Sequence, residues 1–138
     1  MKILTRRIVV QKTPEELQSI ISSCSYRFTR IIFTGKDFSF LCPKRFNGGI
    51  VGLFPIKGTI SPIGTNLEVS LYACADIPFY FGILLAICAI AGIIRHFFLG
   101  LSECIFYIGV LLFGLLLMAR TVWESSSLLD LIEKKIYS

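Results

Sequence analysis

The sequence has few of the residues from which metal sites and disulfide frameworks are built. It contains one histidine, His96, and five cysteines, no two of which are spaced as C-x-x-C. The number of cysteines is odd, and Cys88 falls inside a long apolar run. This pattern argues against a zinc site and against a disulfide framework. We expect the cysteines to act as small apolar side chains in a reducing compartment.

Catalytic patterns are also lacking. A serine or cysteine nucleophile needs a histidine within reach, but an apolar segment separates His96 from the serine run at 125–127. Thr34-Gly35-Lys36 lacks the upstream glycine of a P-loop, and Asp37 replaces the hydroxyl residue that should follow. We therefore predict no catalytic residue, no cofactor and no metal ligand, and we expect that the chain is not an enzyme.

Charge is absent from two long stretches, residues 77–94 and 105–119. The chain is 54% hydrophobic, above the roughly 45–50% of soluble domains, and the excess lies in these stretches. A membrane-spanning helix needs roughly 20 mostly apolar residues. The sequence thus predicts a transmembrane hairpin over 76–119, with helices at about 77–95 and 101–119. The alternative, two buried helices of a soluble core, would normally show a polar stripe.

The distribution of basic residues predicts the topology. Ten of the fourteen Lys and Arg residues precede residue 77, and three follow the second apolar run. Cytoplasmic segments carry the excess of Lys and Arg, so both termini are expected in the cytoplasm of a cell with an inner membrane. Arg95 would lie at the outer surface, where it could pair with Glu103. Arg120 and Trp123 would lie at the inner membrane interface.

The net charge of +5 has two explanations. Basic residues near anionic lipid gain about 1 kcal/mol each, whereas nucleic-acid binding would need a clustered basic face that the sequence lacks. The expected partners are therefore the lipid bilayer and another membrane protein or a second copy, but not nucleic acid.

Residues 1–75 are expected to form a small cytoplasmic α+β domain. Thr13, Pro14 and Glu16 form a capping box with proline in the first turn, which predicts a helix start. Its apolar face would consist of Leu17, Ile20, Ile21 and Cys24. The other expected elements are strands at 3–10, 26–34, 37–42 and 65–73, a strand at 50–60 broken by Pro55, a tight turn at 35–36, a loop at 43–49 and a turn at 61–64.

The last segment, 120–138, predicts a separate amphipathic helix beginning near the serine run at 125–127. Leu128, Leu129, Ile132 and Ile136 share one face at helical spacing. We expect this cytoplasmic helix to pack back on the sheet. The alternative is a helix lying on the membrane, although its polar face is not notably basic.

Small residues mark one face of the first apolar run. Gly82, Ala86 and Ala89 form a strip of the kind that lets membrane helices approach closely. Such a strip can serve the hairpin itself, a homodimer or contact with another membrane protein, and the sequence leaves these three uses open.

Several turn and strand segments share their order with a known architecture. They are Phe33-Thr34-Gly35, the pair Phe38 and Phe40, Pro55-Ile56-Lys57-Gly58-Thr59-Ile60 and Gly64-Thr65-Asn66-Leu67-Glu68-Val69. With the hairpin and the amphipathic tail, this order resembles a family of small bacterial membrane proteins. In that family two membrane helices interrupt a split, pleckstrin-homology-like sheet domain before its last helix. The resemblance implies no activity and no functional residue.

The expected fold is thus a membrane α+β fold. It combines a small antiparallel sheet domain and its N-terminal helix with a two-helix transmembrane hairpin and a C-terminal amphipathic helix that packs back on the sheet. The preferred function is a non-enzymatic interaction or regulatory module, such as an accessory subunit or an immunity-type protein. The alternatives are a small oligomeric transporter or channel subunit, and a lipid-acting enzyme using Glu68, Asp76 and Glu124.

Overall fold

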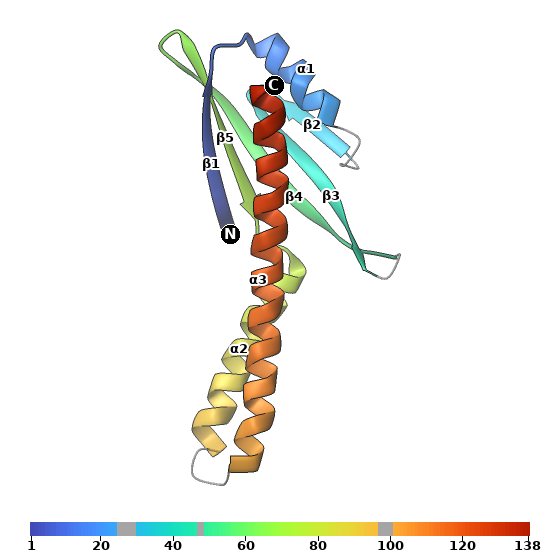
Figure 1. Ribbon diagram of the computed structural model, residues 1–138, viewed down its shortest axis with the longest axis vertical. Coiled ribbons are helices and arrows are strands. Elements are labelled where there is room, and N and C mark those ends of the chain that lie inside the picture. The colour runs from blue at the N-terminus through green and yellow to red at the C-terminus, as the bar shows by residue number, and fades with distance from the viewer. Residues whose placement is uncertain (25–29, 47–48, 97–100) are drawn as a thin grey trace. The chain divides into compact units, whose positions relative to one another are not determined.

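The computed structural model describes residues 1–24, 30–46, 49–96 and 101–138, with the side chains of these except 42–46, 49–54 and 101–103. It contains five antiparallel strands and three helices, of which two are long and apolar (Figure 1). The strands are β1 Lys2–Val10, β2 Arg30–Thr34, β3 Asp37–Phe46, β4 Gly49–Ile63 and β5 Asn66–Cys74, and the helices are α1 Pro14–Ser23, α2 Ile77–His96 and α3 Leu101–Tyr137.

The chain divides into two compact units, each described separately below. The first, the sheet unit, comprises Met1–Ala75 and Glu124–Ser138. The second, the hairpin unit, comprises Asp76–Trp123 and holds α2 and the first two thirds of α3.

The sheet has the strand order β1-β5-β4-β3-β2. Two-residue loops join β2 to β3 and β4 to β5, since Thr34 pairs with Asp37 and Ile63 pairs with Asn66. Gly35 and Gly64 occupy these loops with φ of 63° and 59°, a backbone conformation that glycine adopts without steric cost. The predicted hairpin turn at 35–36 is confirmed.

Helix α1 begins as predicted. The Thr13 hydroxyl accepts a hydrogen bond from the Glu16 amide, and the Glu16 carboxylate accepts one from the Thr13 amide. Leu17, Ile21 and Cys24 are fully buried, so the predicted apolar face packs into the core.

One hydrophobic core lies on one face of the sheet. Alternate residues of the strands point into it, among them Ile8, Phe40, Val69 and Leu71. About two turns of α3 complete this core, with Leu129, Ile132 and Ile136 fully buried in the same cluster. The C-terminal part of α3 therefore packs on the sheet, as predicted for the amphipathic segment.

The predicted break in the fourth strand is wrong, because β4 runs without interruption through Pro55 and Pro62. At each proline, β4 pairs with one neighbouring strand among the described residues. Pro55 pairs with Leu41 of β3, one residue before pairing with β5 begins at Ile56. Pro62 pairs with Leu67 of β5, beyond the last β3 pair. A missing amide hydrogen is tolerated at such edge positions, and the turn expected at 61–64 lies instead at Gly64 and Thr65.

The loop expected at 43–49 is also largely wrong. Strand β3 continues to Phe46 and β4 begins at Gly49, so the expected loop residues 43–46 are strand. Residues 47 and 48 of the expected loop lie outside the described residues, as do residues 26–29 of the strand predicted at 26–34.

The separate helix predicted for 120–138 does not exist. Helix α3 runs as one element of 37 residues from Leu101 to Tyr137. The serine run at 125–127 is therefore not a helix start, and Ser125 is buried within the helix. Serine is compatible with a helix interior where packing fixes the backbone.

Candidate functional site

Within the described residues of the sheet unit, no helix packs on the face of the sheet opposite the core. Both α1 and the end of α3 contribute to the core on the other face. The open face is therefore the main surface of the sheet unit available for recognition.

One row of side chains crosses this open face through the middle of β4. The register pairs Thr5 with Tyr72, Tyr72 with Lys57, Lys57 with Ser39 and Ser39 with Ile32, so that one residue of each strand stands in line. Lys57 occupies the middle of the row, on the central strand. We call these five residues the central row.

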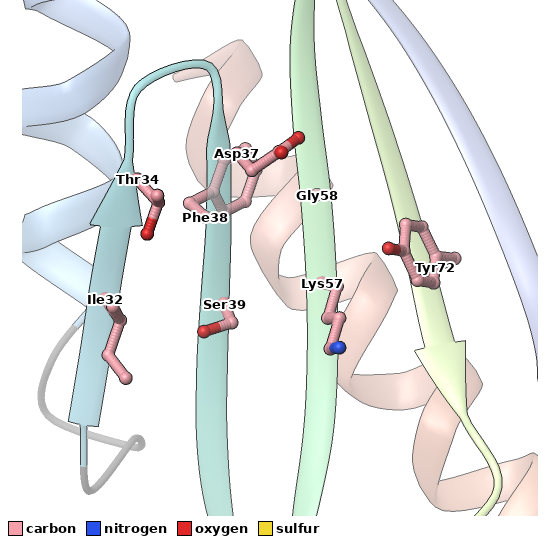
Figure 2. A pocket seen from close by; sticks show the side chains of 8 residues that line it. All are labelled: Ile32, Thr34, Asp37, Phe38, Ser39, Lys57, Gly58 and Tyr72. Carbon is pink, nitrogen blue, oxygen red and sulfur yellow. The ribbon is translucent and has the colours of Figure 1, made fainter.

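The central row borders a shallow pocket of about 310 Å³ (Figure 2). Figure 2 shows Lys57 between Ser39 and Tyr72, with the phenol oxygen directed towards β4. The lining residues are Ile32, Thr34, Asp37, Phe38, Ser39, Lys57, Gly58 and Tyr72. The pocket thus brings one ammonium group together with three hydroxyl groups.

Some polar groups of the pocket have hydrogen-bond or ion-pair partners within the described part of the protein, and others do not. Asp37 Oδ1 accepts a hydrogen bond from Thr59 Oγ1 at 2.9 Å. The Lys2 ammonium lies 4.2 Å from the centre of the Tyr72 ring, a cation–π geometry that adds a second positive charge. Among the described residues, Lys57 has no ion pair and the hydroxyls of Ser39, Thr34 and Tyr72 have no hydrogen bond. The pocket therefore has hydrogen-bond donors available.

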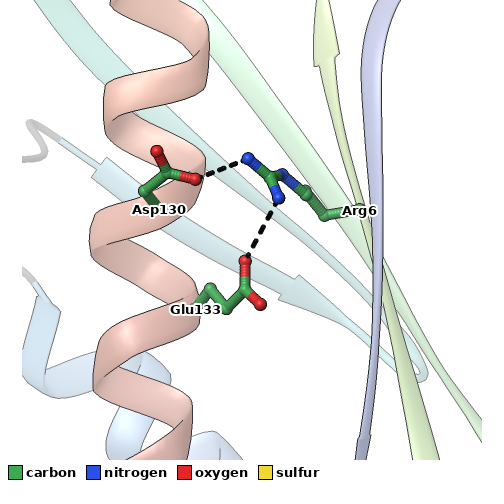
Figure 3. A network of polar contacts seen from close by, with 3 residues as sticks. All are labelled: Arg6, Asp130 and Glu133. Carbon is green, nitrogen blue, oxygen red and sulfur yellow. Dashed lines mark hydrogen bonds and ion pairs between the residues drawn. The ribbon is translucent and has the colours of Figure 1, made fainter.

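The core side of the sheet unit has a polar contact of its own. Arg6 of β1 bonds Asp130 at 2.7 Å and lies 3.9 Å from Glu133, one turn further along α3 (Figure 3). Lys12 Nζ donates to the carbonyl of Ile136 at 2.8 Å. These contacts attach the end of α3 to β1 and to the segment before α1.

In the hairpin unit the predicted small-residue strip faces α3. A Cβ added at Gly82 would lie 2.7 Å from the carbonyl oxygen of Gly114, and one at Gly114 would lie 2.8 Å from that of Gly82. Ala89 is fully buried and Ala86 half-buried. Gly82 therefore serves the close approach of α2 and α3 within the hairpin. Sequence reasoning missed Gly114 as its partner, although the two glycines stand at nearly equal distances from the segment that connects α2 to α3.

A buried carboxylate lies at the start of the hairpin. Asp76 Oδ1 accepts hydrogen bonds from the amide of Phe79 at 3.1 Å and from the hydroxyl of Thr121 at 3.3 Å. Asp76 and Thr121 are 7% and 1% exposed. Asp76 caps the first turn of α2 and binds α3, whereas Glu68, another carboxylate of the enzyme hypothesis, lies 3.7 Å from Arg7.

The residues predicted for the membrane interface are all exposed. They are Arg95 near the end of α2, and Arg120 and Trp123 in α3. The ring of His96 stacks on Tyr107 with 5.4 Å between centroids. The predicted pairing of Arg95 with Glu103 lies outside the described side chains. No group of three or more His, Cys, Asp or Glu side chains suited to a metal occurs among the described residues.

An apolar groove runs along the hairpin unit beside Gly109. It has a volume of about 510 Å³, and its lining residues are Phe81, Leu85, Ile105, Phe106, Gly109, Val110 and Phe113. A Cβ added at Gly109 would meet nothing within 4 Å, so the groove is open at this point.

Comparison of the chain with family models, with curated proteins and with solved structures finds no match. Any functional conclusion therefore depends on the residues and surfaces described above.

Proposed function

We propose that this chain is a membrane-anchored, non-enzymatic interaction module of the inner membrane. In this proposal α2 and the first part of α3 cross the bilayer as a hairpin, with both termini in the cytoplasm. The sheet unit recognises a protein partner, as an accessory subunit or an immunity-type protein does.

The apolar exposure of the hairpin unit is the observation that carries the proposal. Both helices are long and apolar enough to span a bilayer, and only 22% of the most apolar 18-residue window of α2 and 11% of that of α3 is buried. Exposed residues include Leu84 at 55%, Ile87 at 59%, Ile94 at 68%, Phe106 at 68% and Leu116 at 62%. Soluble monomers rarely expose contiguous apolar patches above a few hundred Å², so lipid is the fitting environment.

The charge distribution supports the proposed orientation. The sheet unit contains twelve Lys and Arg and seven Asp and Glu residues, so it carries the whole net charge of +5. The hairpin unit contains two of each sign. A basic unit is favoured on the cytoplasmic side by the positive-inside rule and near anionic lipid.

The composition of the sheet unit suits binding better than proton transfer. Met1–Ala75 and Glu124–Ser138 contain no histidine. Its open face instead presents the central row and hydroxyl groups that can donate hydrogen bonds. These are properties of a recognition surface.

Two measurements test the proposal in sequence. After lysis without detergent and ultracentrifugation, the protein should remain with the membranes, and recovery in the supernatant would refute the anchor. Cross-linking in native membranes should then capture one defined protein partner, whereas recovery of lipid and self-contacts alone would refute the interaction role.

The groove beside Gly109 favours a second candidate, a small oligomeric transporter or channel subunit. Two helices cannot enclose a pore, but an open apolar groove is a surface through which hairpins can associate. This candidate requires an oligomer in mild detergent and solute flux through liposomes. A monomer without flux would eliminate it.

A further inference from the structure

We infer that the pocket around Lys57 binds an acidic segment of the partner protein, with a carboxylate of that segment seated on the Lys57 ammonium group. This inference rests on the proposed function and adds the chemistry of the partner. It follows from the position of Lys57, the charge of the open face and the exposed apolar residues on that face.

The position of Lys57 gives the first argument. It stands in the middle of the central row, with two strands on each side. Ser39 and Tyr72, its cross-strand neighbours, bring hydroxyl donors to the same pocket (Figure 2). A carboxylate accepts several hydrogen bonds through two oxygens, so it matches an ammonium group flanked by hydroxyls.

The charge balance of the two faces gives the second argument. On the core side, Arg6 is already engaged by Asp130 and Glu133. Among the described side chains, the open face carries a basic excess: Lys2, Arg7, Arg30 and Lys57 against Asp37 and Glu68. Complementary charge guides association and selects partners, so this excess favours an acidic partner.

The apolar residues of the open face favour a protein over a lipid headgroup or a free anion. Ile32 at one end of the central row is 37% exposed, and Val9 and Ile63 are 51% and 49% exposed. Protein interfaces combine aromatic and aliphatic contacts with a few polar anchors. A free phosphate could also accept hydrogen bonds from Lys57 and the neighbouring hydroxyls, but it would leave these apolar side chains in water.

Site-specific cross-linking in native membranes is the first test. A photoreactive benzoylphenylalanine at position 34, on the pocket rim, should link to a segment of another protein that is rich in Asp and Glu. The same group at position 15, on α1, is the matched control. Lys57→Glu should abolish the link and Lys57→Arg should retain it, while Lys134→Glu on α3 should leave it unchanged.

Three results would overturn the inference. They are a link to lipid, a link to a segment without acidic residues, and a link that survives Lys57→Glu. If general cross-linking captures a partner but position 34 does not reach it, the interaction role stands and the pocket is refuted. If no partner is captured from any position, the proposed function itself fails.

A direct binding measurement separates the sources of negative charge. The full chain in neutral-lipid nanodiscs is titrated with a hexaglutamate peptide, with hexaglutamine, with inorganic phosphate and with vesicles containing phosphatidylglycerol. Hexaglutamate should bind, and Lys57→Met should weaken it roughly tenfold, because a hydrogen bond to a charged group is lost. Equal weakening by Lys134→Met, or Lys57-dependent binding of phosphate or vesicles in preference to the peptide, would contradict the inference.

Discussion

The ring of Phe38 leaves no room for a side chain at position 58 of strand β4. It lies against the backbone of Gly58, where an added Cβ would be 2.2 Å from ring atom Cζ. The ring also contacts Phe33 and Phe40, with centroids 6.0 Å and 5.6 Å away. A rigid aromatic ring held by two others has little room to move, so Gly58 is required for packing.

We predict that Gly58→Ala lowers the free energy of unfolding by about 1–3 kcal/mol, the usual cost of overpacking a core. The measurement is chemical unfolding of the full chain in mild detergent, followed by circular dichroism. Gly109→Ala is the control, because a Cβ there meets nothing within 4 Å. Phe38→Leu should partly rescue Gly58→Ala, and strictly additive effects of the two changes would contradict the packing argument.

Cys24 gives a prediction for pH. Burial raises the pKa of its thiol above the ordinary value of 9.0, against an opposing effect of Lys135. The unfolded chain therefore ionises first as pH rises. The stability linked to Cys24 is complete below about pH 9 and is lost as pH increases through the raised folded pKa.

Unfolding at a series of pH values between 8 and 11 checks this prediction. The free energy of unfolding of the native chain should fall more steeply above pH 9 than that of Cys24→Ala. The other titrating groups are shared by both proteins, so the difference between the curves isolates Cys24. Parallel curves would show that the thiol is not linked to folding.

At the scale of elements, the end of α3 is held to the sheet by apolar contacts more than by charge. Ile132 is fully buried, whereas the side chains of Arg6 and Asp130 are 45% and 56% exposed. Exposed ion pairs typically contribute less than about 1 kcal/mol, and truncation of a buried isoleucine costs about 2–5 kcal/mol.

We therefore predict that Ile132→Ala destabilises the sheet unit by about 2–5 kcal/mol and that Asp130→Asn changes its stability by less than about 1 kcal/mol. Both variants can be compared by urea unfolding in the same detergent. A larger effect for Asp130→Asn than for Ile132→Ala would mean that the ion pair, and not the core, docks the helix.

The sequence predicted those elements whose signals are local. The capping box at Thr13, the two-residue turn at Gly35 and the alternation of β5 each depend on a few neighbouring residues. The loop predicted at 43–49 and the break predicted at Pro55 were wrong in part because proline excludes a central ladder position but not an edge one. Which positions are at an edge depends on strand register, which the sequence does not reveal.

The same limit applies to the candidate site. Lys57, Ser39 and Tyr72 lie far apart in the sequence and carry no motif. They come together only through the pairing of β3 with β4 and of β4 with β5. Likewise, the continuity of α3 through Ser125 follows from packing that a local pattern does not contain.

At the scale of the whole molecule, the proposed membrane location predicts an asymmetry between two apolar surface positions. Ile87 in the middle of α2 is 59% exposed, and Ile63 at the end of β4 is 49% exposed. In water, arginine is tolerated at both. In a bilayer, an arginine near the helix centre costs about 2.5–3.5 kcal/mol.

Ile87→Arg should thus reduce the fraction of protein that resists alkaline extraction from membranes, while Ile63→Arg should not. The apolar residues of α2 gain about 3–6 kcal/mol on insertion, so one arginine cancels much of that gain. An unchanged membrane fraction for Ile87→Arg would argue that α2 is not surrounded by lipid.

The assembly of the core from both ends of the chain has a consequence for biosynthesis. Ile8, Val69 and Leu71 leave the ribosome first, and Leu129, Ile132 and Ile136, which cover them, emerge more than fifty residues later. At roughly 5–20 residues per second, translation leaves the apolar face of the nascent sheet uncovered for several seconds. During that interval the unfinished sheet is a substrate for chaperones, and a nonsense codon just after the hairpin would leave it permanently without its cover.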